Sequence, residues 1–174
     1  MTTLRPFECT DLFRFNSINL DPLTETYNIP FYMQYISTWP SLCATYEDGA
    51  TGRLMGYILG KAEGEKELWH GHVTAVTVSP EYRRLGVAKY LMAHLEEVSG
   101  RQYNAFFVDL FVRVSNLLAQ LMYRNLGYVV YRRVLGYYSR EEDAFDMRKA
   151  LPRDVKKKSM IPLPHPITPD ELEW

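Results

Sequence analysis

The sequence lacks the features that mark several classes of protein. Among its 174 residues only two are cysteines, Cys9 and Cys43, and their spacing fits no metal-binding motif, so we expect reduced thiols. No apolar run approaches the roughly 20 residues that cross a bilayer. The start, MTTLRPFECT, lacks the basic-then-apolar layout of a secretory signal. These features predict a cytoplasmic protein with no membrane contact.

An excess of charge of one sign is also missing. Twenty basic residues face 21 acidic ones, which gives a net charge of -1. This balance excludes the overall basic excess of a protein that binds nucleic acid through electrostatics alone, and we expect no direct nucleic-acid partner. Aromatic residues are abundant instead, with 13 Tyr, 8 Phe and 3 Trp. Such a chain can line a pocket or an interface with rings.

Hydrophobic periodicity predicts one α/β domain over residues 1–150. The expected strands are 2–7, 42–46, 53–62, 69–78, 105–112, 128–138 and 144–149, and the expected helices are 11–20, 31–39, 84–99 and 116–126. The strand-helix-strand order in the middle requires a parallel pair, 69–78 beside 105–112, in a mixed sheet.

Helix boundaries and the end of the chain give further expectations. The expected helix starts are Thr10 or Asp11, Pro30 and Ser115, and the expected helix ends are Gly100 and Gly127. From about residue 151 the composition changes, because half of the ten prolines and the run Lys156–Lys158 fall there. We expect residues 151–174 to form an extended tail that lies on the domain or on a partner.

The most informative stretch is VTVSPEYRRLGVAKYL at 76–91, where a strand ends and a helix begins. The first amides of a helix point outward without internal partners, and a glycine at Gly86 allows close approach of a phosphate. Arg83 and Arg84 add positive charge. The alternative is a plain strand-to-helix turn with solvated arginines.

The context of this R-x-x-G-x-A motif resembles the pyrophosphate loop of the GNAT acetyltransferases. The segment VRVSNLLAQLMYRNLGY at 112–128 is similar to the second signature of that superfamily. The resemblance implies the GNAT fold, a mixed, mostly antiparallel sheet with a central splayed parallel strand pair and flanking helices. It also implies acetyl-CoA as cosubstrate and no metal.

The same resemblance implies how acetyl-CoA is held. Its pantetheine arm would lie in the gap of the parallel pair on the backbone of Val76 and Val78, and its pyrophosphate would lie on the amides of 83–88. The residues implied at the loop are Arg83, Arg84, Gly86, Val87 and Ala88. Asn116 and Tyr123 would line the channel, with Tyr123 helping the thiolate to leave. A tyrosine packed in the core is the alternative for Tyr123.

Nearly the whole chain is similar to the catalytic subunits of NatB-type N-terminal acetyltransferases. The similarity runs from TTLRPFECTDLFRFNSINL through WHGHVTAVTVSPEYRRLGVA and FFVDLFVRVSN to DMRKALPRD and IPLPHP. It implies acetylation of nascent chains that begin Met-Asp, Met-Glu, Met-Asn or Met-Gln. It also implies a heterodimer with a large helical auxiliary subunit that docks the pair on ribosomes.

A pocket that accepts both carboxylates and amides needs neutral, adaptable hydrogen-bonding groups. His72 and Thr74 lie two apart on one strand and therefore face the same side, so we assign them to the second substrate residue. His70 shares this parity and stays open as a further candidate. Polar residues of an ordinary sheet face are the alternative.

The resemblance places four further residues at the peptide. Glu25 and Tyr27 would shape the pocket for Met1, and the pair Tyr137–Tyr138 would close over the peptide backbone. A solvated carboxylate and ordinary sheet tyrosines are the alternatives. No acidic residue stands out as the base, and His72, Tyr27 or Tyr138 acting through a water stay open.

Two other functions remain open from the sequence. The chain could acetylate a lysine side chain or a small amine, or it could be a non-catalytic adaptor that binds acetyl-CoA. Comparing peptides that begin MD, ME, MN or MQ with lysine peptides and polyamines distinguishes N-terminal acetylation from the first alternative. An assay of thiol release distinguishes an active enzyme from the adaptor.

Overall fold

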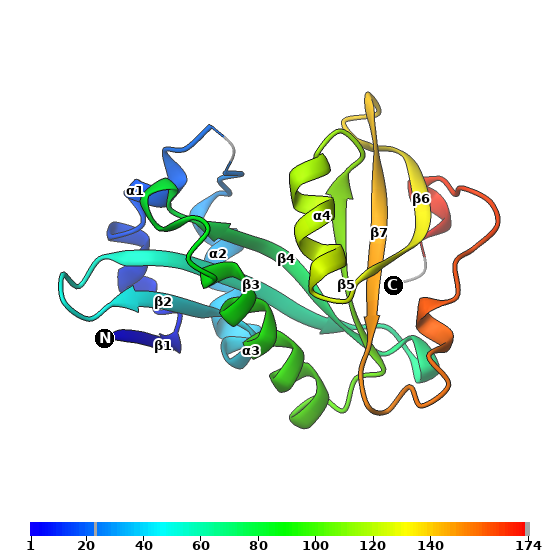
Figure 1. Ribbon diagram of the computed structural model, residues 1–174, viewed down its shortest axis with the longest axis horizontal. Helices are drawn as coiled ribbons and strands as arrows, with labels where there is room; N and C mark the ends of the chain where they lie inside the picture. Colours follow the sequence, from blue (N-terminus) through cyan, green and yellow to red (C-terminus); the bar gives the residue numbers. More distant parts are fainter. Residues whose placement is uncertain (23, 173–174) are drawn as a thin grey trace. The chain divides into compact units, whose positions relative to one another are not determined.

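The computed structural model describes residues 1–22 and 24–172 (Figure 1). The strands are β1 (Thr2–Pro6), β2 (Ala44–Asp48), β3 (Leu54–Glu63), β4 (His70–Val78), β5 (Phe107–Arg113), β6 (Val129–Tyr138) and β7 (Glu142–Ala150). The helices are α1 (Asn16–Asn19), α2 (Ile29–Thr38), α3 (Val87–Arg101) and α4 (Leu117–Asn125). Within the described residues, hydrogen bonds join the strands in the order β1-β2-β3-β4-β5-β7-β6.

The strand directions confirm the predicted mixed sheet. β1 with β2, β2 with β3, β5 with β7 and β6 with β7 are antiparallel pairs. β4 and β5 are neighbours, and α3 joins them along the chain, which is the crossover that a parallel pair requires. Gly52, with a φ of 68°, supports the predicted hairpin that joins β2 and β3.

The chain forms two compact units. The first comprises Met1–Lys61 and Val73–Val98. Figure 1 shows α3 in front of the strands of this unit and α2 behind them. The core of the first unit is rich in aromatic rings and contains Phe7, Phe15, Ile18, Tyr32, Tyr35, Cys43, Leu54, Tyr57 and Leu59. Five of the aromatic residues of the sequence are therefore buried here.

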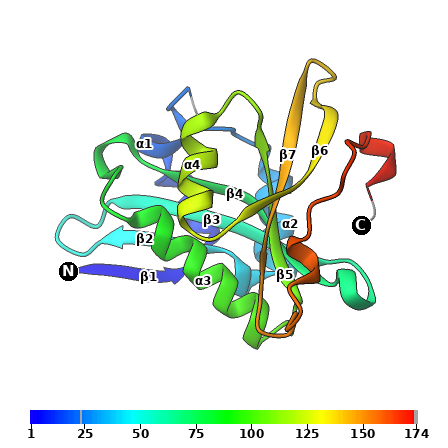
Figure 2. The ribbon, with the colours of Figure 1, turned by 45° about the vertical axis from the view of Figure 1, so that its right-hand side comes forward.

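The second unit comprises Ala62–His72 and the chain from Ser99 onward. Its C-terminal segment runs beside β6 in both views (Figures 1 and 2). The Leu135 amide donates to the carbonyl of Ile167 at 2.8 Å, and the Ile167 amide donates to that of Arg133 at 3.0 Å. Ile167 and Leu172 pack with Val134 in a small core. These contacts hold the proline-rich segment on β6.

The helix predicted at 11–20 is wrong. A 3-10 turn over Cys9–Phe13 and the single-turn helix α1 replace it. The side chain of Asp11 is fully buried, where it accepts hydrogen bonds from Arg5 and from the amide of Glu8. Glu8 is therefore the cap, rather than Thr10 or Asp11. This ion pair, between residues six positions apart, ties the chain to β1 and overrides its local helical periodicity.

Both boundaries of α3 also differ from the expectation. α3 begins at Val87 rather than at residue 84, because Arg84 and Gly86 have positive φ values of 64° and 83° that no helix contains. It continues through Gly100 to Arg101, and the left-handed residue that follows is Asn104. None of the helices within the described residues is long and apolar enough to cross a membrane.

Candidate active site

The predicted anion loop lies in the first unit, in the turn between β4 and α3. Its residues Arg84 and Gly86 are exposed and have left-handed backbone conformations. There is open space beside Gly86. A Cβ atom added to this glycine would have a ring carbon of Tyr90, at 3.6 Å, as its nearest neighbour. Arg84 and the first backbone amides of the 15-residue helix α3 are therefore accessible to a ligand. This arrangement fits a pyrophosphate group.

Other members of the predicted loop have different surroundings. Arg83 forms an ion pair with Asp21 and donates to the carbonyl of Val78 at 3.3 Å, so its charge is already partly balanced. Val87 is buried and Ala88 is half-buried, which leaves their backbone rather than their side chains for a ligand. Val76 and Val78 are half-buried on β4. The roles of these residues in binding the cofactor stay predictions.

The helix α4 carries Asn116 and Tyr123 seven residues apart, which places them on one helix face. Asn116 is the N-cap, where its side-chain oxygen accepts from the amide of Ala119 at 3.1 Å. The predicted cap Ser115 is wrong, because its hydroxyl bonds Glu142 instead. Burial raises the pKa of Tyr123 to about 12, so its hydroxyl keeps its proton at neutral pH. A buried, protonated phenol can donate a hydrogen bond to a developing anion.

A chain of rings in the first unit connects Tyr27 to Thr74. Tyr27 stacks on Phe31 with ring centroids 4.2 Å apart, and Phe31 contacts Tyr35 at 4.8 Å. Thr74 donates a hydrogen bond to the hydroxyl of Tyr35 at 2.8 Å. Glu25 is exposed. The sequence reading missed Tyr35, and its i+4 spacing from Phe31 on a predicted helix was the available signal.

A second group in the second unit brings together three predicted residues. The ring of Phe111 lies 5.6 Å from His72 and stacks on Tyr137 at 4.7 Å. Tyr138 donates its hydroxyl to the carbonyl of Phe111 at 3.3 Å. His72, Tyr137 and Tyr138 therefore all contact one residue of β5, Phe111, that the sequence reading did not select.

His72 is buried and is held by Asp109, another residue that the sequence reading missed. The His72 Nδ1 atom lies 2.7 Å from Asp109 Oδ1. Burial alone would raise the pKa of Asp109, but His70, His72 and Arg148 outweigh burial and place that pKa well below its ordinary value. The signal in the sequence was a lone acid inside the apolar strand AFFVDLFV, since a buried charge requires partners.

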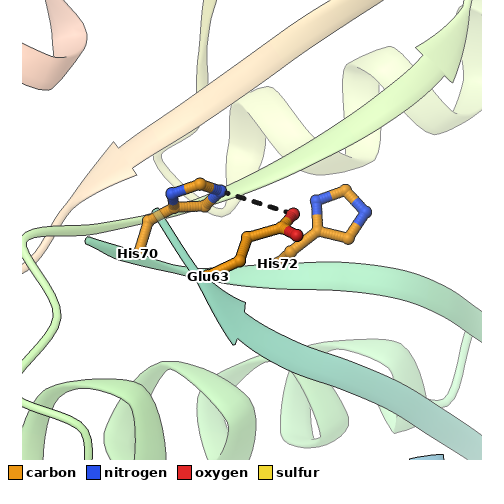
Figure 3. A group of neighbouring side chains, drawn as sticks. All are labelled: Glu63, His70 and His72. Atoms are coloured by element: carbon orange, nitrogen blue, oxygen red, sulfur yellow. Dashed lines mark ion pairs between the residues drawn. The ribbon is translucent and has the colours of Figure 1, made fainter. Parts of the chain in front are cut away.

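Glu63, His70 and His72 lie close together on β3 and β4 (Figure 3), with one possible ligand atom from each within 4.8 Å of the others. Such residue types can hold a metal ion. In this structure, however, the Nδ1 of His72 is bonded to Asp109 and that of His70 lies 2.6 Å from the carbonyl of Leu68. We therefore interpret the group as a cluster of ion pairs around the carboxylates of Glu63 and Asp109.

A cavity in the second unit lies apart from the predicted site residues. Its volume is about 390 Å³, and its lining includes Glu67, Phe106, Tyr131, Arg148 and Lys158. None of the residues predicted to bind acetyl-CoA or peptide lines it. The cavity therefore does not mark the predicted site.

The fold and the loop fit a protein that binds a pyrophosphate-containing cosubstrate, and comparison with known proteins identifies the family. The model of the acetyltransferase (GNAT) family matches residues 11–128. The chain therefore belongs to the GNAT acetyltransferase family. This confirms the predicted family and, with it, the predicted fold.

More specific similarity covers the full chain. The chain is 63% identical over 174 residues to the N-terminal acetyltransferase B complex catalytic subunit NAA20 of Arabidopsis thaliana, covering 100% of this chain and 99% of that protein. The crystal structure of Chaetomium thermophilum Naa20 in complex with a bisubstrate analogue superimposes with a TM-score of 0.88, at 42% identity over 97% of each chain. A chain of the NatB acetyltransferase complex bound to CoA and MES gives a TM-score of 0.80 at 46% identity, covering 86% of this chain and 99% of that chain.

Proposed function

We propose that this chain is the catalytic subunit of a NatB-type complex, which transfers the acetyl group of acetyl-CoA to the N-terminal α-amine of nascent proteins. Its substrates begin with Met-Asp, Met-Glu, Met-Asn or Met-Gln. The observation that carries this proposal is the 63% identity to a NatB catalytic subunit over 174 residues, the whole chain. The complex contains an auxiliary subunit that is large and helical and that docks the pair on ribosomes in the cytoplasm.

Acetyl-CoA supplies an activated acetyl group on a thiol that can leave. Arg84 and the amides that follow Gly86 bind its pyrophosphate, and Tyr123 donates a hydrogen bond to the leaving sulfur. The α-amine has a pKa near 8, so a modest base suffices to remove its proton at neutral pH. Alignment of the two reactants supplies much of the rate.

The hydroxyl pair of Thr74 and Tyr35 explains how one pocket serves both acids and amides. The two oxygens are 2.8 Å apart, and each hydroxyl can rotate to donate or to accept. When the substrate offers a carboxylate, Thr74 donates to it and accepts a hydrogen bond from Tyr35. When the substrate offers an amide N–H, Thr74 accepts from it and donates to Tyr35. No fixed charge selects one substrate class.

The function is tested with the purified chain together with its auxiliary subunit. We expect peptides beginning MD, ME, MN and MQ to be acetylated, and an Ala-first peptide, an N-terminally blocked lysine peptide and a polyamine to be poor acceptors. Preferred acetylation of lysine or polyamine would instead establish the small-amine alternative. Acetyl-CoA binding without thiol release on any acceptor would establish the adaptor.

Substituting Thr74→Val tests the second-residue pocket while it preserves the shape of the side chain. We expect kcat/KM to fall alike for MD and MN peptides, because a hydrogen bond to the substrate is lost. The loss should correspond to about 1–3 kcal/mol of transition-state binding free energy. The affinity for acetyl-CoA should not change.

The matched control is Thr77→Val. The Thr77 hydroxyl lies 2.9 Å from that of Thr24, and Thr77 is three residues further along β4, so it faces the opposite side. This control should leave the ratio of MD to Ala-first activity unchanged. Equal losses on every peptide for both variants would contradict the assignment of Thr74.

A further inference from the structure

A buried carboxylate fixes the orientation of His72. Asp109 lies on β5 and is only 2% exposed, and its Oδ1 lies 2.7 Å from His72 Nδ1. The low pKa of Asp109 means that its carboxylate is ionised and can only accept hydrogen bonds. The proton of this bond is therefore on Nδ1 of His72, and the lone pair of a neutral His72 ring is on Nε2.

The ring of His72 is held in place from more than one side. Figure 3 shows one ring nitrogen of His72 on the side of Glu63 and the other pointing away from it. The ring of Phe111 packs against His72 at 5.6 Å between centroids. The bond to Asp109 and this ring contact together determine which way Nε2 points.

The surroundings of Asp109 keep its charge in one position. The register of β5 and β7 pairs Asp109 directly with Arg148, which also bonds Asp146 at 3.0 Å. On β4, His70 Nε2 lies 3.5 Å from Asp109 Oδ1 and 3.8 Å from Glu63 Oε1. The titratable and charged groups that face Asp109 are thus His70, His72, Arg148, Asp146 and, through His70, Glu63.

We propose that Asp109 is a positioning residue for acetyl transfer, which holds His72 as the Nδ1–H tautomer so that its Nε2 accepts a proton or a hydrogen bond from the substrate. This inference rests on the proposed function and on the prediction from the sequence that His72 contacts the peptide. The carboxylate also stabilises the imidazolium that forms when Nε2 takes a proton from the attacking amine, directly or through a water. The amine nitrogen bonds the acetyl carbon, the C–S bond breaks, and the electron pair leaves with the thiolate.

The substitution Asp109→Asn removes the charge and preserves the size of the side chain. In the chain paired with its auxiliary subunit, we expect kcat/KM for an MD peptide to fall about 10- to 100-fold at pH 7.5, as for other groups that orient a histidine. The Kd for acetyl-CoA should not change. The size of the loss should vary with pH, because the carboxylate that faces the proton-accepting ring is gone.

The peptide amine titrates alike in both enzymes, so the ratio of the two profiles reports on His72. Asp146→Asn is the matched control, because Asp146 is an equally buried acid of the same unit whose carboxylate bonds Arg132 and Arg148. It should lower the melting temperature without changing the shape of the pH profile. A loss for Asp109→Asn that is the same at every pH would overturn the proposal.

A double-mutant cycle separates positioning from a purely structural role. In a His72→Gln background, Asp109→Asn should lower kcat/KM less than about twofold, because the group through which it acts is gone. A structural role predicts the same loss in both backgrounds, which would also overturn the proposal.

A measurement on the wild type does not depend on whether a variant folds. NMR of a ¹⁵N-histidine-labelled sample at pH 8 should show His72 protonated on Nδ1 and not on Nε2. The opposite tautomer would refute the proposal even if the enzyme acetylates MD peptides as expected. Conversely, a chain that shows the Nδ1–H tautomer but acetylates no peptide would contradict the proposed function and leave the Asp109–His72 interaction standing.

Discussion

Replacing Gly86 by glutamate should weaken acetyl-CoA binding about 100-fold. The new carboxylate would stand at the exposed turn where α3 begins, beside the place assigned to the pyrophosphate. Two unit charges about 5 Å apart repel by about 3 kcal/mol at an effective dielectric constant near 20, which corresponds to about two orders of magnitude in Kd. Calorimetric titration with acetyl-CoA measures the change directly.

Two companion variants separate charge from backbone strain. Gly86→Gln has the same shape without the charge and should bind acetyl-CoA much more tightly than Gly86→Glu, and added salt should narrow that difference. Gly52→Glu places the same side chain at another positive φ, 68°, with open space around it. Both glutamate variants share a strain of about 1–2 kcal/mol, but only Gly86→Glu should alter the Kd. A folded Gly86→Glu protein with unchanged affinity would refute the assignment of the loop.

Local patterns in the sequence predict the middle of the chain well. The alternation of WHGHVTAVTV and the switch to helical spacing after it correspond to β4 and α3, because both signals extend over several repeats. The parity rule also holds, since His70 and His72 both reach Asp109. The two left-handed residues before α3 were less visible, because arginine rarely adopts the positive φ that Arg84 has.

The errors arise where a buried side chain and its partners, rather than the spacing of apolar residues, decide a local structure. The segment from residue 11 has helical spacing, but the buried carboxylate of Asp11 bonds Arg5 and the amide of Glu8 and breaks the helix. Asp109 was missed for the same reason, because its histidine partner is 37 positions away in the sequence. A sequence shows that a charge lies in a buried strand, but only the strand pairing shows what neutralises it.

Replacing Tyr123 by phenylalanine should lower kcat by about 10²–10³, the usual cost of removing one donor to a developing anion. Because burial raises the pKa of Tyr123 to about 12, the hydroxyl stays protonated throughout the range from pH 6 to 10. An ordinary thiol has a pKa near 8.5, so the phenol keeps its proton and stabilises the leaving sulfur through a hydrogen bond. Activity should therefore show no decline from ionisation of Tyr123 up to about pH 10.

The matched control is Tyr128→Phe. Tyr128 is also buried, and its ring meets that of Tyr123 edge-on at 6.1 Å, so both variants lose one hydroxyl from the same packed region. Tyr128→Phe should change the melting temperature while it leaves kcat within a fewfold of the wild type. The KM for acetyl-CoA should stay similar in Tyr123→Phe, because the interaction that is lost forms fully only as the C–S bond breaks. If Tyr123→Phe instead raises that KM and leaves kcat unchanged, Tyr123 contributes to binding the cofactor and does not assist the departure of the thiolate.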